Sequence, residues 1–416
     1  MSHVVIVGCG VVGAAIAYEL SLNPTLTITV LDQQPPAQGS TGAALGVLMG
    51  AISQKKKGRA WAMRDASLRR YASLIPELEA ATGLQVPYNQ DGIVLLRFEG
   101  DEDEEKWQTL ATLRQSQGWQ LDLWNAETLE LRCPQVGTQL GDRPICGAIH
   151  SVHDRQLDPV ALTHALVAAA KLNGVTFHFD VRVTTVLPVG NGGDRHHSPP
   201  SYQVECIRLL QDEEEPTTPV FSMAPADWIV LSTGLGTFPL TASIATSGIR
   251  SESNPSETTP NPTSGAPIDI RPVAGQAVRI QIPHPVDETT FSPVISGHDL
   301  HVVPLGAGDY WVGATVEFPD EATTAPGNQD VATHEHQLEK VLQGAFDLFP
   351  ALSTGTIIQQ WVGYRPRPWN RPAPIIEPLD RQSHIILATG HYRNGVLLAP
   401  ATAQRVNDFI VPENRA

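Results

Sequence analysis

The chain has 416 residues, 41% of them hydrophobic, so it can bury a large core, and its length predicts two domains. Its formal net charge of −16 argues against nucleic acid or an anionic membrane surface as a partner, because both are bound mainly through Lys and Arg. The four cysteines show no CxxC or metal-ligand spacing, so we expect neither a disulfide framework nor a metal site. Such sparse cysteine usage is typical of a reducing cytoplasm.

The most apolar segment of the chain, residues 4–20, could be mistaken for a signal peptide. No basic residue precedes it, it contains three glycines, and no small-residue cleavage pattern follows it. It is also too short and too interrupted by glycine to span a bilayer. We therefore predict a soluble cytoplasmic protein.

The first predicted elements are a strand, a glycine turn and a helix. Residues 3–8 are a β-branched run typical of a buried parallel strand, and residues 14–20 have a helical pattern. Between them lies GCGVVG, a GxGxxG motif, and a second β-branched run ends at Asp32. The glycines allow backbone to approach a pyrophosphate, and the acid can accept hydrogen bonds from ribose hydroxyls. The motif predicts NAD or FAD, while the acid disfavours NADP because of its 2′-phosphate.

The next segment favours FAD over NAD. Residues 38–50 are small and are predicted to open a second helix with its backbone close to a ligand. The pyrophosphate and ribityl chain of a flavin extend past the first turn, so a second small-residue segment beside the cofactor suits FAD. A further helix is predicted at residues 59–82, then strand, turn and strand at 86–98, and polar surface helices at 101–133.

The middle of the chain is predicted to contain further strands and a helix, and then another strand of the cofactor-binding sheet. Strand patterns at residues 145–152 and 175–189 flank an amphipathic helix at 160–173. Residues 228–236, WIVLSTGLG, read as a buried strand entering a glycine turn. Residues 191–219 and 246–267 are rich in Gly, Pro, Ser, Thr or acids and are predicted to be insertions, the second a surface loop.

The last third combines an antiparallel sheet with a second ligand-binding turn. Strands are expected at residues 278–282, 301–303 and 310–316, and a helix at 334–349. A buried strand at 385–388 then enters TGHYRNGVLLAPATA, residues 389–403, which reads as a glycine-bracketed turn and a helix start with proline in its first turn. The helix start and its arginine suit an anion or an electron-rich carbonyl.

Four motifs together resemble the D-amino-acid oxidase superfamily, and in particular its bacterial glycine oxidase branch, associated with thiamine synthesis. They are the GxGxxG with Asp32, the STGAALG at 40–46, the GYRP at 363–366, and the tail after residue 389. The resemblance implies an α/β fold: a discontinuous Rossmann-like FAD-binding domain, interleaved with an α+β substrate domain built on an antiparallel sheet. The predicted segments are 1–84, 151–236 and 357–416 for the first domain, and 85–150 and 237–356 for the second.

The family resemblance also implies a chemistry. FAD is held noncovalently, and the substrate is glycine, a small D-amino acid or a sarcosine-like secondary amine. Hydride transfer from the substrate Cα to flavin N5, followed by hydrolysis and reoxidation by dioxygen, gives an oxo acid, ammonia and hydrogen peroxide. The alternatives are a dehydrogenase that passes electrons to another acceptor, and a protein that holds flavin as a structural or sensing ligand. The family further suggests a homo-oligomer.

Residue by residue, the resemblance implies a cofactor site that runs through the whole chain. Val183 meets the adenine through its backbone, and the segment from His391 to Leu397 wraps the flavin ring. The implied FAD-binding residues are Gly8, Gly10, Val11, Val12, Gly13, Asp32, Gln33, Ser40, Thr41, Leu45, Gly46, Val47, Val183, Thr233, Gly234, His391, Tyr392, Arg393, Asn394, Gly395, Val396 and Leu397.

The implied substrate site rests on Arg365 and Arg393. Arg365 matches the arginine that pairs with the substrate carboxylate, and Arg393 a second substrate-contacting arginine; the alternatives are a surface cation and a structural salt bridge. The chain departs from the glycine oxidases at three positions, with His301 in place of tyrosine, Val316 of methionine and Asp299 of histidine. His301 could replace the tyrosine hydroxyl as a partner of the carboxylate, or it could be an ordinary strand histidine.

Overall fold

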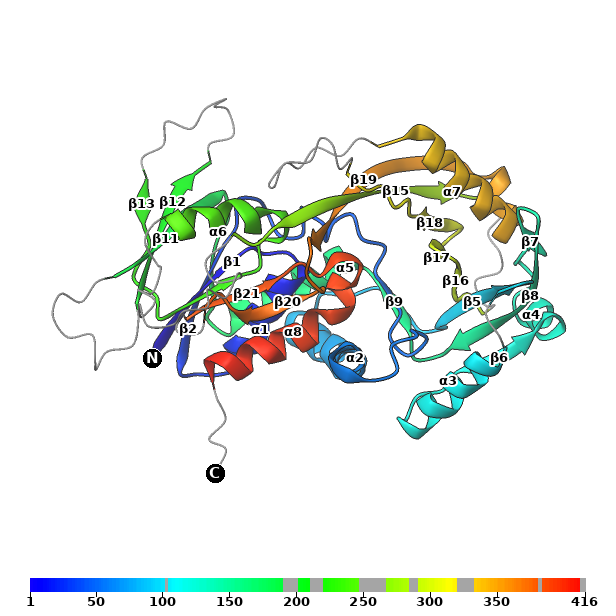
Figure 1. Cartoon of the computed structure of the whole chain (residues 1–416), viewed down its shortest axis with the longest axis horizontal. Coiled ribbons are helices and arrows are strands. Elements are labelled where there is room, and N and C mark those ends of the chain that lie inside the picture. The colour runs from blue at the N-terminus through cyan, green and yellow to red at the C-terminus, as the bar shows by residue number, and fades with distance from the viewer. Residues whose placement is uncertain are drawn as a thin grey trace, which may run out of the picture.

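The computed structural model describes residues 1–101, 104–189, 201–209, 220–246, 267–283, 291–319, 333–380 and 384–411. Its first layer is a six-stranded sheet in the order β10-β2-β1-β14-β21-β20 (Figure 1). All neighbours in it are parallel except β20, which runs antiparallel to β21. The strands are β1 (Ser2–Val7), β2 (Leu26–Leu31), β10 (Thr176–His178), β14 (Trp228–Leu231), β20 (Ile375–Pro378) and β21 (Ile385–Thr389).

The two faces of this sheet bury different side chains because successive residues of a strand point to opposite sides. Val4 and Ile6 of β1 contact the helices of one face, while Val5 and Val7 contact the other layer. The first face is covered by α1 (Val11–Ser21), α2 (Gly58–Thr82), α5 (Pro159–Leu172) and α8 (Gly395–Ile410). The second is covered by α6 (Thr237–Thr246) and the sheet of β11 (Val181–Pro188), β12 (Tyr202–Arg208) and β13 (Phe221–Ser222).

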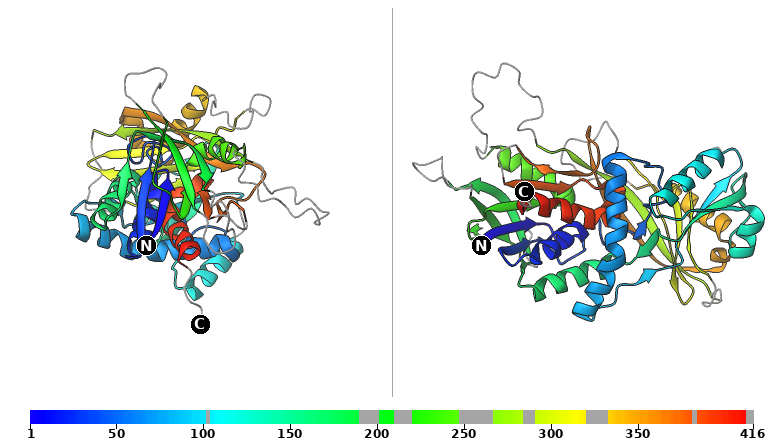
Figure 2. Two further views of the ribbon diagram at one scale, coloured as in Figure 1. Left: turned by 90° about the vertical axis from the view of Figure 1, so that its left-hand side faces the viewer. Right: turned by 90° about the horizontal axis from the view of Figure 1, so that it is seen from below.

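A second, nine-stranded sheet extends away from the first (Figures 1 and 2). Its order is β19-β15-β18-β17-β16-β5-β8-β6, with β7 beside β8, and it is antiparallel except where β16 meets β5. Its strands are β5 (Ile93–Phe98), β6 (Asp122–Asn125), β7 (Gln139–Leu140), β8 (Arg143–Ser151), β15 (Ile270–Gln281), β16 (Val294–Gly297), β17 (Leu300–Gly306), β18 (Asp309–Gly313) and β19 (Thr356–Pro368).

Shorter elements complete the described chain. Helix α7 (Glu335–Leu348) packs on the nine-stranded sheet, where Leu338, Ala345 and Leu348 join its core. The others are α3 (Glu104–Ser116), α4 (Ala126–Arg132), the three-stranded sheet of β3 (Val47–Leu48), β4 (Tyr88–Asn89) and β9 (Arg155–Leu157), and the 3₁₀ turns η1 (Gly234–Gly236), η2 (Pro350–Thr354) and η3 (Tyr392–Asn394). No helix in the described chain is both long and apolar enough to cross a membrane.

The α/β fold class is confirmed, but several predicted elements are wrong in detail. Residues 38–50 do not open a helix, because Ala37 and Gly46 have φ of +66° and +71°, and Val47–Leu48 forms β3 instead. The predicted helices at 101–133 are separated by β6, and Arg114 on α3 is fully buried. The predicted strand at 310–316 ends at Gly313.

The two predicted insertions have different outcomes. Residues 201–209 belong to the fold, because β12 places Tyr202, Val204 and Cys206 in the core beside the six-stranded sheet. The rest of 191–219, and 246–267 apart from its two ends, lie outside the described residues. The domain boundaries remain a prediction; residues 357–368, assigned above to the FAD-binding domain, lie in β19 of the nine-stranded sheet.

Candidate active site

The turn after β1 requires glycine at both of its ends. Gly8 has a φ of +103°, and a Cβ there would lie 2.6 Å from the carbonyl oxygen of Ser232. A Cβ on Gly13 would lie 1.9 Å from the carbonyl oxygen of Gly8, so a side chain would force α1 away from β1. The GxGxxG motif therefore meets the steric conditions that a dinucleotide-binding turn imposes.

Free backbone donors lie at the start of α1. Val11 N donates to Thr41 Oγ1 at 3.0 Å, whereas the N–H groups of Val12 and Gly13 have no hydrogen-bond partner among the described residues. A Cβ on Gly10 would lie 3.0 Å from the same Thr41 hydroxyl, so two predicted cofactor segments meet at this point. Unpaired N–H groups at the positive end of a helix can bind a pyrophosphate. The start of α1 therefore fits the pyrophosphate of FAD.

Asp32, at the end of β2, orders the same turn. Its Oδ2 accepts from Cys9 N at 2.5 Å and its Oδ1 from Gln34 N at 2.9 Å. Burial raises the pKa of Asp32, although these hydrogen bonds oppose the rise. Gln33 accepts from Arg182 Nε at 3.1 Å on β11, the strand that carries Val183. The predicted adenosine residues thus lie at one end of the six-stranded sheet; their contacts with the nucleotide remain a prediction.

The segment from Ser40 to Val47 lies against β19. Ser40 Oγ donates to the carbonyl oxygen of Tyr364 at 2.6 Å, and Trp361 Nε1 donates to that of Ala43 at 3.1 Å. A Cβ on Gly46 would lie 1.8 Å from the carbonyl oxygen of Leu157. Leu45 packs against the nine-stranded sheet, and Val47 lies in β3. This segment therefore connects the predicted cofactor site with the sheet that carries Arg365.

Thr233 and Gly234 follow β14 and lie beside the end of β21. The hydroxyl of Thr233 is 3.0 Å from that of Thr237, which is 2.8 Å from that of Thr389. Gly234 has a φ of +55° and begins η1. The strand ends of β14 and β21 are thereby joined just where the turn at residues 390–394 begins.

That turn passes through two residues with positive φ before α8 begins at Gly395. They are Gly390 at +65° and Tyr392 at +54°. His391 is buried, and its Nε2 is 2.9 Å from Thr402 Oγ1. Burial, reinforced by Arg59, lowers the pKa of His391 to about 3, so the ring is neutral. Its side chain is hydrogen-bonded to α8, which favours the backbone as the source of its predicted contribution to the flavin site.

Proline lies deeper in α8 than the sequence predicted. Pro400 is the sixth residue of the helix and cannot donate to the carbonyl oxygen of Val396. Tyr71 Oη of α2 donates to that oxygen instead, at 2.5 Å, and Ser67 Oγ accepts from Ala401 N at 3.3 Å. Helix α2 thus satisfies the backbone groups that proline leaves unpaired in the predicted flavin-binding helix.

The side chain of Arg365 crosses from β19 onto β15. Its Nη1 donates to the carbonyl oxygen of Ala274 at 2.9 Å, and its guanidinium lies over Gly275, where a Cβ would be 2.4 Å from Nη2. None of the described carboxylates forms an ion pair with it. Burial and the nearby Arg393 lower its pKa. Its remaining donors are therefore available to an anion, which would also relieve the repulsion between the two arginines.

His301 and Arg365 project from the same face of the nine-stranded sheet. His301 pairs with Gly313, Gly313 with Ala277, and Ala277 with Trp361, and residues directly opposite one another share a face. Arg365 lies four residues after Trp361 and so on the same side of β19. This is the face that contacts the predicted cofactor segment through Trp361.

The polar residues beside Arg365 form one charged cluster. Arg393 forms an ion pair with Asp299 at 2.7 Å, which is the kind of contact expected of its alternative role as a salt bridge. Its contact with the substrate stays a prediction. His301 Nδ1 is 2.8 Å from Ser296 Oγ. Burial, with Arg393 and Arg365 adding to it and Asp299 opposing it, lowers the pKa of His301 to about 4. His301 is therefore a neutral hydrogen-bonding group. Val316 is partly buried in the loop after β18.

Sequence reasoning missed several residues that support the site. Asp154 accepts from the three consecutive N–H groups of residues 50–52 at 2.6–2.8 Å. Arg114 donates to the carbonyl oxygens of Ala51, Ser53 and Lys55 at 2.7–2.9 Å. Arg64 donates to Asn394 Oδ1 at 3.3 Å. No local pattern marks them, because each partner is distant in sequence.

Comparison with known proteins identifies the family. The model of the DAO family, described as FAD dependent oxidoreductase, matches residues 3–408. The bifunctional protein ThiO/ThiG of Trichormus variabilis is 28% identical over 416 residues, 99% of this chain and 53% of that protein. The chain thus spans about half the length of this relative. The glycine oxidase of Bacillus licheniformis is 24% identical over 408 residues, 98% of this chain and 92% of the enzyme.

A solved structure supports the fold. The crystal structure of glycine oxidase from Geobacillus kaustophilus superposes with a TM-score of 0.75 at 21% identity, covering 100% of this chain and 96% of that one. The glycine turn, the free N–H groups of α1 and the second turn before α8 fit FAD, the cofactor of the matched family. The chain belongs to the DAO family of FAD-dependent oxidoreductases.

Proposed function

We propose that the protein oxidatively deaminates glycine, small D-amino acids or sarcosine-like secondary amines, with dioxygen as the acceptor. The reaction consumes the amino acid, dioxygen and water and gives an oxo acid, ammonia (or an amine) and hydrogen peroxide. The observation that carries the proposal is Arg365, a partly buried cation beside the predicted flavin segment with no carboxylate partner in the described chain. A partly buried guanidinium without a counter-ion is stabilised when an anion binds it.

Each residue of the cluster has a separate task in this proposal. Arg365 holds the substrate carboxylate in a bidentate fork, and Arg393, already fixed by Asp299, adds positive charge on the same side. His301 is neutral at working pH and can donate one hydrogen bond to the carboxylate while its other nitrogen faces Ser296. FAD, when bound, supplies the hydride acceptor and the route of electrons to dioxygen. The protein's own contribution is to fix the substrate Cα in one orientation.

The test is a peroxide assay with glycine, sarcosine, D-alanine and D-proline on flavin-loaded protein. Turnover of at least one of them in air supports an oxidase. Turnover only with an artificial dye supports the alternative, a dehydrogenase with another acceptor. If none of the four reduces the flavin under anaerobic conditions, the amino acid assignment is wrong.

A second measurement tests the assigned role of Arg365. Arg365→Met should lower kcat/KM by roughly 100-fold or more, because an arginine–carboxylate pair in a desolvated site is a major source of binding and orientation. Arg405→Gln, which removes an exposed arginine on α8, is the control for the change in charge. Unchanged flavin bleaching in Arg365→Met would show that another group anchors the substrate.

A further inference from the structure

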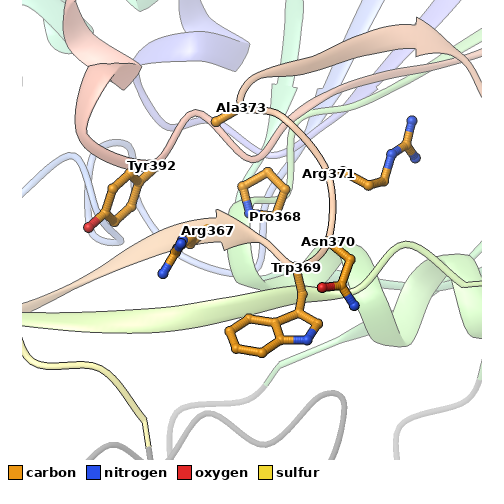
Figure 3. Close-up of a pocket in the computed structure, with 7 residues that line it drawn as sticks. All are labelled: Arg367, Pro368, Trp369, Asn370, Arg371, Ala373 and Tyr392. Carbon is orange, nitrogen blue, oxygen red and sulfur yellow. The ribbon is translucent and has the colours of Figure 1, made fainter.

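A second basic pocket adjoins the proposed substrate site. It has a volume of about 440 Å³ and lies between the end of β19, the loop after it and η3 (Figure 3). Arg367, Trp369, Asn370 and Tyr392 contribute to its walls. In Figure 3, the side chains of Arg367 and Tyr392 lie close together, while that of Arg371 points away from them. The pocket thus combines a cation, an amide and two aromatic rings.

Arg367 has no acidic partner among the described residues, whereas three other arginines of this region each form an ion pair. Arg371 forms an ion pair with Glu377, Arg271 with Asp269 at 3.0 Å, and Arg393 with Asp299 at 2.7 Å. The described contacts of Arg367 are with rings instead: its guanidinium carbon is 5.6 Å from the ring centroid of Tyr392 and 5.0 Å from that of Phe318. In a protein with a net charge of −16, an arginine without a carboxylate partner in the described part of the chain is a candidate contact for an external anion.

The position of Arg367 relates this pocket to the substrate anchor. Arg365 and Arg367 are two residues apart on β19, so they lie on the same face with Cα atoms roughly 7 Å apart. Tyr392, the opposite wall, directly precedes Arg393 in the chain. Both walls of the pocket are therefore continuous with the residues proposed to surround the substrate carboxylate.

A further cation, Arg59, lies near the loop that lines the pocket. Arg59 Nη2 is 3.5 Å from the carbonyl oxygen of Pro374, next to the pocket residue Ala373. It is close enough to His391 to contribute to the lowering of that ring's pKa. Arg59 is thus a second cation near the pocket, in a molecule with a net charge of −16.

We propose that this pocket receives a second acidic group of the substrate, so that the preferred substrates are dicarboxylic amines: amino acids with an acidic side chain, or glycine carrying an N-carboxymethyl group. This inference rests on the proposed function, since Arg365 must hold the first carboxylate. Arg367 donates two hydrogen bonds to the second carboxylate, and Asn370 and the aromatic rings enclose that carboxylate. Arg367 is then a specificity-determining residue, while Arg365 sets orientation for every substrate.

The experiment compares charged substrates with their neutral isosteres. D-aspartate is paired with D-asparagine, D-glutamate with D-glutamine, and iminodiacetate with its monoamide. In the wild type, the charged substrate with the highest kcat/KM should exceed its own amide in kcat/KM by roughly 10- to 100-fold. This is the range expected of one hydrogen bond to a charged group. In Arg367→Gln that ratio should fall toward one, whereas Arg405→Gln should keep it.

Calorimetry gives a readout that needs no turnover. Succinate should bind the flavin-loaded protein at least tenfold more tightly than its monoamide, succinamate, and Arg367→Gln should remove the difference. Equal affinities in the wild type, or a difference that survives Arg367→Gln, would overturn the pocket assignment. The proposed function fails separately, if no amino acid of either panel reduces the flavin. If glycine or D-alanine reduces it and no charged substrate exceeds its amide, only the present inference fails.

Discussion

Gly275→Ala tests the placement of Arg365 without changing any charged residue. The added Cβ would lie 2.4, 2.5 and 2.6 Å from Nη2, Nη1 and Cζ of Arg365. Ordinary contact begins at 3.4 Å, so the guanidinium must move by about 1 Å. Because these atoms are the end of a flexible side chain and Gly275 does not need a positive φ, the fold should tolerate the methyl group.

The displaced guanidinium should weaken substrate binding and orientation. An interaction with a charged group contributes about 1.5–3 kcal/mol, which corresponds to roughly 10- to 100-fold in kcat/KM. Anaerobic stopped-flow flavin reduction measures the effect, and thermal unfolding reports stability. Gly344→Ala is the control, because it adds the same methyl group to α7, 3.2 Å from Leu300 Cδ2 and outside the predicted cofactor and substrate residues. Normal reduction kinetics in a folded, flavin-loaded Gly275→Ala protein would refute the view that Arg365 binds the substrate from its present position.

Three other predictions concern stability and cofactor binding. Tyr71→Phe should lower the free energy of unfolding by about 1–3 kcal/mol in urea titrations, because the carbonyl oxygen of Val396 loses its donor. The pKa of His391 is about 3 in the fold and near its ordinary value when unfolded, so the unfolded state binds more protons between them. Stability should therefore fall as pH drops from about 6.5 toward 3, and less so in His391→Asn. Gly13→Ala should yield protein without FAD or no folded protein, judged by the visible flavin spectrum, because its Cβ would meet the carbonyl oxygen of Gly8.

The parts of the site that sequence predicted are those determined locally. The turn between Gly8 and Gly13 is specified by backbone sterics within a few residues, so its motif is visible in the sequence. Arg365, the proposed substrate anchor, stands in a short motif on one strand. FAD as the cofactor and the α/β architecture are likewise confirmed.

The parts that sequence did not predict depend on contacts between distant segments. A helix was expected at residues 38–50 from their small side chains, but the pairing of β3 with β9 decides their conformation. The first-turn position of Pro400 was wrong because the helix begins five residues before it, at Gly395. What makes a proline tolerable in its second turn is Tyr71, on another helix. The identity of the substrate depends on side chains from several strands, which no single motif contains.

Strand β19 has a thermodynamic consequence beyond its place at the edge of the sheet. It carries Arg365, and its backbone and indole groups are hydrogen-bonded to Ser40 and Ala43 of the cofactor segment. In the proposed function, β19 holds the substrate through Arg365, so FAD bound at the cofactor segment would help to order the strand that contacts the substrate. Linkage then requires reciprocity: whatever factor FAD adds to the affinity for a carboxylate, the carboxylate must add to the affinity for FAD. A non-oxidisable carboxylic acid should slow the loss of flavin from the protein as well as inhibit it.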